Sequence, residues 1–367
     1  MTTILTINPG STSTKVGLFD NDTALFTEKV AHAADKLAFY EGLSEQLPYR
    51  RDCILEALGA HDVDLAKIDA FVGRGGGLLP VDGGTYAVNS TMLSHAMKAA
   101  NGVIHPANLG SQLAHEFALF ADPSHPRPAF VVNPPDTDEL CDCARMTGIK
   151  GVYRHVHLHA LNLKETAIRH AASLGRQYEE CNFVVCHVGG GTSVSAHRKG
   201  KMVDGNDIVG GEGPMTPTRC GAMPVVEILD LIEEGRSVKE VRKMCMKTGG
   251  FTDLLGTSDA MAVQQRAELG DAEAKRAWDA MLYQVCKEIG AMACVLGGEV
   301  DGIVLGGGMV HSNELVDRII ANCGWIAPVT AYPGEFELEA MAAGALRVLK
   351  GEEVAKEYTG IPVWQGF

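Results

Sequence analysis

The sequence predicts an α/β protein, and three observations lead to this fold class. Short apolar runs of strand length alternate with longer amphipathic segments of helical length, which is the pattern of α/β folds. A glycine triplet directly follows three of the apolar runs, at residues 75–77, 189–191 and 306–308. The chain has 367 residues, which is too long for one ordinary core and therefore predicts two domains.

In the first half, strands at residues 4–7 and 16–19 are expected on either side of a tight turn with the sequence NPGSTSTK. A helix-prone segment follows at about 39–58. The other elements expected in this half are a strand at 68–72, a helix with apolar residues at helical spacing (Leu109, Leu113, Phe117 and Phe120), and a strand at 129–132.

The second half repeats this alternation, and Gly or Pro residues mark several of its helix ends. The expected elements are, in order, a helix at about 154–174, a strand at 183–186, a helix that starts at Pro224, a long amphipathic helix at about 278–296, a strand at 303–305 and a helix at about 338–349.

An internal repeat relates the two halves. Gly10-Ser11-Thr12-Ser13 matches Gly190-Gly191-Thr192-Ser193, and both stretches lie between two apolar runs, 180 residues apart. Backbone amides in a glycine-rich turn form an anion-binding nest, and hydroxyl groups and Lys15 add donors and charge. We therefore expect two similar domains that each present a phosphate-binding hairpin, although such turns can also be plain connections.

Composition and motifs exclude several classes of function. The formal net charge is −14 and no basic run is present, so nucleic acid and anionic membranes are not expected as partners. No apolar stretch approaches the roughly 20 residues of a membrane span, and the N-terminus lacks the features of a signal peptide, which predicts a cytoplasmic protein. The ten cysteines form no C-x-x-C pair, and neither a P-loop nor a dinucleotide-binding fingerprint occurs.

Seven blocks in a fixed order resemble the butyrate kinase family of short-chain carboxylate kinases, which is related to acetate kinase and belongs to the acetate and sugar kinase, Hsc70 and actin superfamily. The blocks are NPGSTSTK (8–15), GRGGGLLPVDGGTY (73–86), HPANLG (105–110), HALNLK (159–164), CHVGGGTSVSAH (186–197), GEGPMTPTRCG (211–221) and PGEFELEAMAAGALRVLKGEE (333–353). The resemblance covers about residues 4–353.

The resemblance implies two duplicated actin-like (ribonuclease H-like) domains with an ATP cleft between them. The first domain is expected to comprise residues 1–150 and about 340–367, and the second residues 151–340. The resemblance also implies ATP and ADP, Mg²⁺ and a homo-oligomer, either a dimer or a larger assembly. The implied reaction is reversible, direct in-line transfer of a phosphoryl group from ATP to a small-molecule carboxylate, first of all butanoate, giving butanoyl phosphate.

This chemistry needs cations and hydrogen-bond donors more than it needs a base, because a carboxylate is already ionised at pH 7. The resemblance assigns catalytic roles to Arg74, Arg219, Asn8, Lys15, His159 and Asp138. It places Ser11, Ser13, His187, Gly189, Gly190, Gly191, Gly306, Gly307 and Gly308 around the nucleotide, and Glu337 with Asn8 around the metal. His159 and His187 also fit core positions, and Glu337 also fits the acidic start of a helix.

One residue departs from the family pattern. Asn133 stands where the family usually has an aspartate before proline, and an amide cannot neutralise a metal; Asp136 or Asp138 are possible substitutes. This departure leaves open a nucleotide-binding switch with little turnover. Kinases for branched-chain acids, propionate or acetate are also open. A sugar kinase is less favoured, since it needs a base to activate a hydroxyl group.

Overall fold

The computed structural model describes residues 1–367 and divides into two compact units. The first unit comprises Met1–Asp138 and Phe336–Phe367, and the second comprises Glu139–Glu335. The chain therefore leaves the first unit after residue 138 and returns to it at residue 336, whereas the sequence placed these crossings near 150 and 340.

The first unit is built on a mixed sheet of seven strands. Its strands are β1 (Thr3–Pro9), β2 (Ser13–Asp20), β3 (Thr23–Ala31), β4 (Ala70–Gly73), β5 (Thr85–Ala87), β6 (Ala129–Val132) and β12 (Lys356–Glu357). The spatial order is β12-β5-β6-β4-β1-β2-β3. The strands β1, β2 and β3 form an antiparallel meander, and β4 and β6 add to it in parallel with β1.

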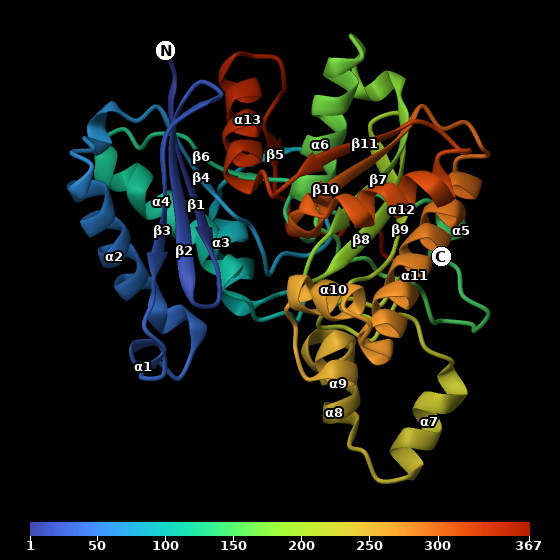
Figure 1. Cartoon of the computed structure of the whole chain (residues 1–367). Coiled ribbons are helices and arrows are strands. Elements are labelled where there is room, and N and C mark those ends of the chain that lie inside the picture. Colours follow the sequence, from blue (N-terminus) through green and yellow to red (C-terminus); the bar gives the residue numbers. More distant parts are fainter. The chain divides into compact units, whose positions relative to one another are not determined.

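Helices cover both faces of this sheet. They are α1 (Ala34–Leu37), α2 (Gln46–Ala60), α3 (Ser90–Lys98), α4 (Gly110–Ala121) and α13 (Glu337–Leu349), with 3-10 turns at Leu43–Glu45, Leu65–Lys67 and Pro106–Leu109. Figure 1 shows α4 on one side of the central strands and α13 on the other. Leu5 and Ile7 of β1 share a core cluster with Leu113 and Phe117 of α4, as alternation along a strand requires.

The second unit contains a mixed sheet of five strands with the same path. Its strands are β7 (Asn182–Val188), β8 (Thr192–Arg198), β9 (Lys201–Gly205), β10 (Gly302–Gly307) and β11 (Val329–Pro333), in the order β11-β10-β7-β8-β9. An antiparallel meander is again extended by two parallel strands, so this sheet repeats the part β6-β4-β1-β2-β3 of the first. The two mixed sheets confirm the predicted α/β class and the predicted duplication.

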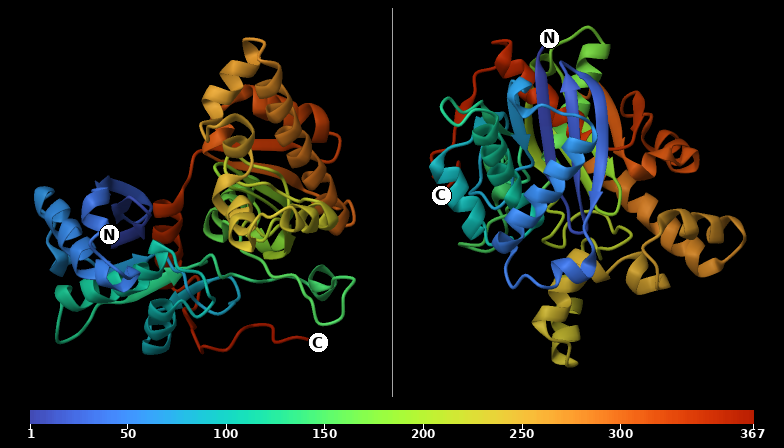
Figure 2. Two further views of the ribbon diagram at one scale, coloured as in Figure 1. Left: turned by 90° about the horizontal axis from the view of Figure 1, so that it is seen from below. Right: turned by 90° about the vertical axis from the view of Figure 1, so that its left-hand side faces the viewer.

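The helices of the second unit are α5 (Asp142–Arg145), α6 (Ala160–Ser173), α7 (Val225–Glu233), α8 (Val238–Lys243), α9 (Phe251–Leu255), α10 (Ala260–Glu268), α11 (Ala272–Val295) and α12 (Asn313–Cys323). Single turns of 3-10 helix lie at Tyr178–Glu180 and Gly308–His311, and a π-helix at Met244–Thr248. Phe183 and Val185 of β7 pack with α6, while Val184 and Cys186 pack with α11 on the other face. Figure 2 shows α7 extending away from this sheet, and α7 has no buried residue.

The structure departs from the sequence predictions where burial is weak. The strand β3 was not predicted because it is an edge strand, in which only Phe26, Glu28 and Val30 are even half-buried. The predicted helix at 154–174 begins only at Ala160, and residues 154–159 before it form no regular secondary structure. None of the helices combines the length and the apolar character needed to cross a bilayer.

Replacing two helical glycines by alanine should have opposite effects on the free energy of unfolding. A Cβ atom at Gly344 of α13 would lie 2.5 Å from Cγ1 of Val132, whereas one at Gly290 of α11 would meet no atom within 4 Å. Overpacking should make Gly344→Ala lower the free energy of unfolding by about 1–3 kcal/mol. Gly290→Ala should raise it by about 0.5–1 kcal/mol through helix propensity. Urea unfolding followed by circular dichroism measures both, and equal stability of the two variants would contradict this packing.

Candidate active site

The first hairpin turn presents polar groups at the end of β1 and β2. Pro9 and Thr14 are the last residues paired across the two strands, and the amide of Gly10 donates to the carbonyl of Ser13 over 2.7 Å. Ser11 at the tip is exposed, and Ser13 is half-buried. Asn8 and Lys15 are paired directly across the ladder, so their side chains project from the same face.

A buried arginine lies beneath this turn. Arg50 of α2 donates to the carbonyl of Gly10 over 2.9 Å and to Oγ1 of Thr14 over 3.3 Å. On its other side, Oγ1 of Thr14 lies 2.8 Å from Nε2 of His32. Burial and the charge of Arg50 lower the pKa of His32 to about 4, so His32 is neutral at pH 7. No motif in the sequence indicates this support, because Arg50 lies outside every glycine-rich stretch.

Arg74 directly follows β4, next to the first turn. A Cβ atom at Gly73 would lie 2.0 Å from the carbonyl oxygen of Gly110, and one at Gly110 would lie 1.9 Å from that of Arg74. Only glycine permits this contact between strand end and helix start. The amide of Arg74 donates to the carbonyl of Ile7, which holds the arginine beside the end of β1.

The side chain of Arg74 is buried in a partly acidic environment. Its Nε lies 3.9 Å from Oε1 of Glu337, and its Nη1 donates to the carbonyl of Asn133 over 3.4 Å. Burial lowers the pKa of Arg74, whereas the charges of Glu337 and Asp136 raise it, so the guanidinium stays charged. Oε2 of Glu337 accepts a 2.6 Å hydrogen bond from Nδ2 of Asn8.

Asn133 has a structural role that explains an amide at this position. Its φ of 36° lies in the left-handed region, which asparagine tolerates better than most residues. Its Oδ1 accepts a 2.7 Å hydrogen bond from the amide of Gly84, and its own amide donates to the carbonyl of Gly84. Asp138 is buried a few residues later, in the segment whose main chain pairs with Val81.

The second hairpin turn is held from one side by two threonines. The amide of Gly189 donates to the carbonyl of Gly191, which closes the turn between β7 and β8. The hydroxyl groups of Thr216 and Thr218 both donate to the carbonyl of Gly190, over 2.8 and 2.9 Å. No pattern in the sequence marks these two threonines as supports of the turn, although both lie in the block GEGPMTPTRCG.

Arg219 packs directly against the second turn. A Cβ atom at Gly191 would lie 1.7 Å from Nη1 of Arg219, so a larger residue there would displace the guanidinium. Nε donates to the carbonyl of Met246, but Nη1 is buried and has no hydrogen-bond acceptor. Burial lowers the pKa of Arg219 and the charge of Asp207 raises it. A buried guanidinium donor without an acceptor is suited to an anion.

Two stacked histidines lie beside the second turn. The rings of His159 and His187 are 4.0 Å apart and nearly parallel. Nδ1 of His159 lies 2.8 Å from Oγ of Ser193, and Nδ1 of His187 lies 2.7 Å from Nδ2 of Asn162. These contacts hold both rings in place, and Nε2 of His187 lies 3.9 Å from Oε1 of Glu335.

The glycines at the end of β10 and directly after it lie next to this group. Gly306 is paired with His187 across the parallel ladder, and a Cβ atom at Gly306 would lie 3.5 Å from Nδ2 of Asn162. Gly307 has a φ of 99°, and a Cβ atom there would lie 2.4 Å from the carbonyl oxygen of Val188. A Cβ atom at Gly308 would meet no atom within 4 Å, so the surface at Gly308 is open.

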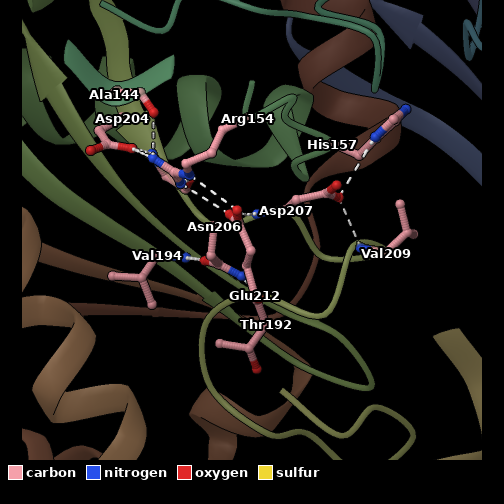
Figure 3. Close-up of polar contacts among 11 residues, drawn as sticks. Ala144, Arg154, His157, Thr192, Val194, Asp204, Asn206, Asp207, Val209 and Glu212 are labelled. Carbon is pink, nitrogen blue, oxygen red and sulfur yellow. Dashed lines mark hydrogen bonds and ion pairs between the residues drawn. The ribbon is translucent and has the colours of Figure 1, made fainter. Parts of the chain in front are cut away.

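An ion-pair network orders the segment that precedes Arg219. Figure 3 shows Arg154 pointing toward Asp204 and Glu212, with N–O distances of 3.0 Å to each carboxylate. Glu212 in turn accepts from the amide of Asp207, whose side chain lies 3.6 Å from Nδ1 of His157. These acidic partners raise the pKa of Arg154. Asp207, whose charge raises the pKa of Arg219, is thereby held in position, and no sequence motif identified it.

Each unit thus collects its own set of the predicted residues. In the first unit, cross-strand pairing and side-chain contacts link Lys15, Asn8, Glu337 and Arg74, with Ser11 and Ser13 in the adjoining turn. Asp138 is in the same unit, and its main chain contacts Val81. The second unit brings together the predicted residues His159, His187, Gly189, Gly190, Gly191, Arg219, Gly306, Gly307 and Gly308.

Comparisons with known proteins agree with this arrangement. The model of the acetokinase family matches residues 149–324. Acetate kinase from Porphyromonas gingivalis has a similar structure, with a TM-score of 0.73 and 18% identity over 95% of this chain and 100% of that one. Propionate kinase from Francisella tularensis gives a TM-score of 0.72 and 20% identity over 94% and 99%. Acetate kinase from Entamoeba histolytica gives a TM-score of 0.73 and 16% identity over 95% of this chain and 99% of that one.

At these identities the similar structures show the fold, whereas the family model supplies the family. The closer resemblance to butyrate kinases stays a prediction. Residues 149–324 thus match the model of the acetokinase family, in a chain that has the fold of acetate kinase along nearly its whole length.

Proposed function

We propose that this protein is an ATP-dependent kinase that transfers a phosphoryl group to a short-chain carboxylate. The observation that carries this proposal is the guanidinium of Arg219, whose buried Nη1 has no acceptor and lies against the glycine turn of an acetokinase-family segment. Such a group is matched to a carboxylate or phosphoryl oxygen. Butanoate is the proposed acid, and acetate, propionate or a branched-chain acid is the alternative.

The chemistry follows from the charge of the acceptor. A carboxylate with a pKa between about 4 and 5 is ionised at pH 7, so its oxygen can attack phosphorus without a general base. The transition state spreads negative charge over the phosphoryl oxygens, and fixed cations stabilise it. Arg74 and Arg219 supply these cations, each held by burial and by neighbouring backbone.

The two turns would bind phosphate oxygens in different ways. The first offers the hydroxyl groups of Ser11 and Ser13 and the ammonium of Lys15. The second offers the main-chain amides of Gly190 and Gly191, next to His187 and His159. The open surface at Gly308 suits the flat adenine base of ATP, because no side chain projects there.

The residues near Arg74 fit a magnesium ion. Mg²⁺ takes one or two protein oxygens and fills its other positions with water and phosphate oxygens. Glu337 provides a partly exposed carboxylate, and Asn8 donates to it through its amide nitrogen, which leaves the amide oxygen of Asn8 as a ligand. Glu337 and Asn8 would therefore hold Mg²⁺, which neutralises charge on the phosphates when bound. Asp138, in the same unit, would assist in binding this ion.

A nucleotide-binding switch is the second candidate, and Asn133 motivates it. The side chain of Asn133 is engaged with Gly84, so its amide serves the local turn and does not replace a catalytic carboxylate. A homo-oligomer also remains a prediction for either function, and light scattering measures its mass.

The direct test is trapping of acyl phosphate with hydroxylamine. The intact protein is incubated with ATP, Mg²⁺ and straight-chain acids of two to five carbons, and hydroxamate is measured. Hydroxamate should form with one or more of these acids, most rapidly with butanoate. No product with any acid would contradict the proposed kinase. Nucleotide binding without product, with product appearing in Asn133→Asp, would support the switch.

The role of Arg219 can be tested without altering its charge. In Gly191→Ala the added methyl group would lie 1.7 Å from Nη1 of Arg219 and must displace the guanidinium. Displacement of about 1 Å should lower kcat/KM about a hundredfold. In the neighbouring variant Gly190→Ala the methyl group meets no atom within 4 Å, and the loss should stay within about tenfold. Equal activity of the two variants would remove Arg219 from the proposed site.

A further inference from the structure

Arg50 is a fully buried cation whose hydrogen bonds all go to neutral groups. Nε and Nη2 donate to Oε1 of Gln46, Nη1 donates to the carbonyl of Gly10 and to Oγ1 of Thr14, and Nη2 also lies 3.5 Å from the carbonyl oxygen of Ser11. No carboxylate is among these partners. The donors are satisfied, but the charge is not compensated.

The contacts of Arg50 fix the orientation of the first turn. In a trans peptide the carbonyl and the following amide point in opposite directions. Because the carbonyls of Gly10 and Ser11 point toward Arg50, the amides of Ser11 and Thr12 point away from it. Neither amide donates a hydrogen bond within the protein, and both residues are exposed. The outer side of the turn therefore presents two free donors.

The charge of Arg50, like the orientation of the two amides, favours an anion on the outer side of the first turn. A buried cation without a counter-charge is costly, and an anion close to it lowers that cost. The neutral His32 beside Thr14 adds no negative charge, and burial lowers the pKa of Arg50 itself. An anion on the outer side of the turn would meet two amides in a positive potential.

We propose that Arg50 is a positioning residue that holds the first turn in its anion-binding form, and that the phosphoryl group bound there supplies the missing counter-charge. In the proposed function this would be the phosphoryl group that is transferred. The expected effect of Arg50 on catalysis therefore rests on the proposed function. Arg50 itself does not touch the ligand, since its donors are all directed inward.

The chain provides a matched control in the next residue. Arg51 lies in the same helix, but its guanidinium is partly exposed and pairs with Asp52 and Glu116. Arg50→Met and Arg51→Met therefore remove the same group from the same helix, and only the first should affect the turn. Arg50→Lys keeps the charge and loses the forked contact with the two carbonyls.

The test is hydrogen exchange of the intact protein with and without inorganic phosphate, followed by mass spectrometry of the peptide that covers residues 8–16. Phosphate should slow exchange of this peptide in the wild type and in Arg51→Met, not in Arg50→Met, and only partly in Arg50→Lys. A peptide that covers the buried strand β4, in the same unit as Arg50, should keep its slow exchange in all variants, which shows that the first unit is folded. The peptide covering residues 187–194 should keep its phosphate protection in all variants, which shows that the second unit is unaffected.

Two outcomes would overturn the inference. One is phosphate protection of residues 8–16 that persists in Arg50→Met, and the other is its absence in the wild type at every phosphate concentration. Exchange requires no turnover, so protection without acyl phosphate formation would leave this inference intact and remove the proposed function. If this inference and the proposed kinase function are both correct, kcat of Arg50→Met should fall by about tenfold to a hundredfold, while KM for ATP changes less than about threefold.

Discussion

The interaction on which this structure depends is the close packing of arginine guanidinium groups against glycine-rich turns at strand ends. Gly191 lies so close to Arg219 that a Cβ atom there would displace its guanidinium, and Gly73 with Gly110 brings the backbone of Arg74 against the start of α4. A buried cation is costly unless its donors have acceptors and an anion supplies the counter-charge, and Nη1 of Arg219 lacks an acceptor in the protein. The turns are therefore suited to ligands that carry several anionic oxygens.

The duplicated sheets explain why two such turns exist. In each sheet the first hairpin turn follows the carboxyl end of the first meander strand, and the parallel neighbour of that strand ends on the same side of the sheet. The strands β1 and β4 in one unit therefore correspond to β7 and β10 in the other. The two copies differ in detail. The first turn is supported by Arg50 and carries hydroxyl groups, whereas the second is supported by threonines and packed against Arg219.

The sequence predicted the parts of the fold that depend on local pattern. Buried strands such as β6 are continuous apolar runs, long amphipathic helices such as α11 have a helical period, and glycine triplets mark the turns. Edge strand β3 lacks a clear apolar alternation, because its half-buried face carries Glu28 between Phe26 and Val30 and the apolar Leu25 lies on the exposed face. Arg50, Arg154 and Asp207 could not be identified as supporting residues, because their roles arise from contacts with residues distant in the sequence, which no spacing reveals.

The central claim is that an oxygen of the carboxylate attacks the terminal phosphorus of ATP directly. It is tested by supplying butanoate labelled with oxygen-18 in its carboxylate and trapping the product with hydroxylamine, which attacks the acyl carbon and releases phosphate with the bridging oxygen. Mass spectrometry of that phosphate should show one labelled oxygen per molecule. Unlabelled phosphate, or label found in AMP, would contradict direct transfer and with it the proposed role of the two arginines.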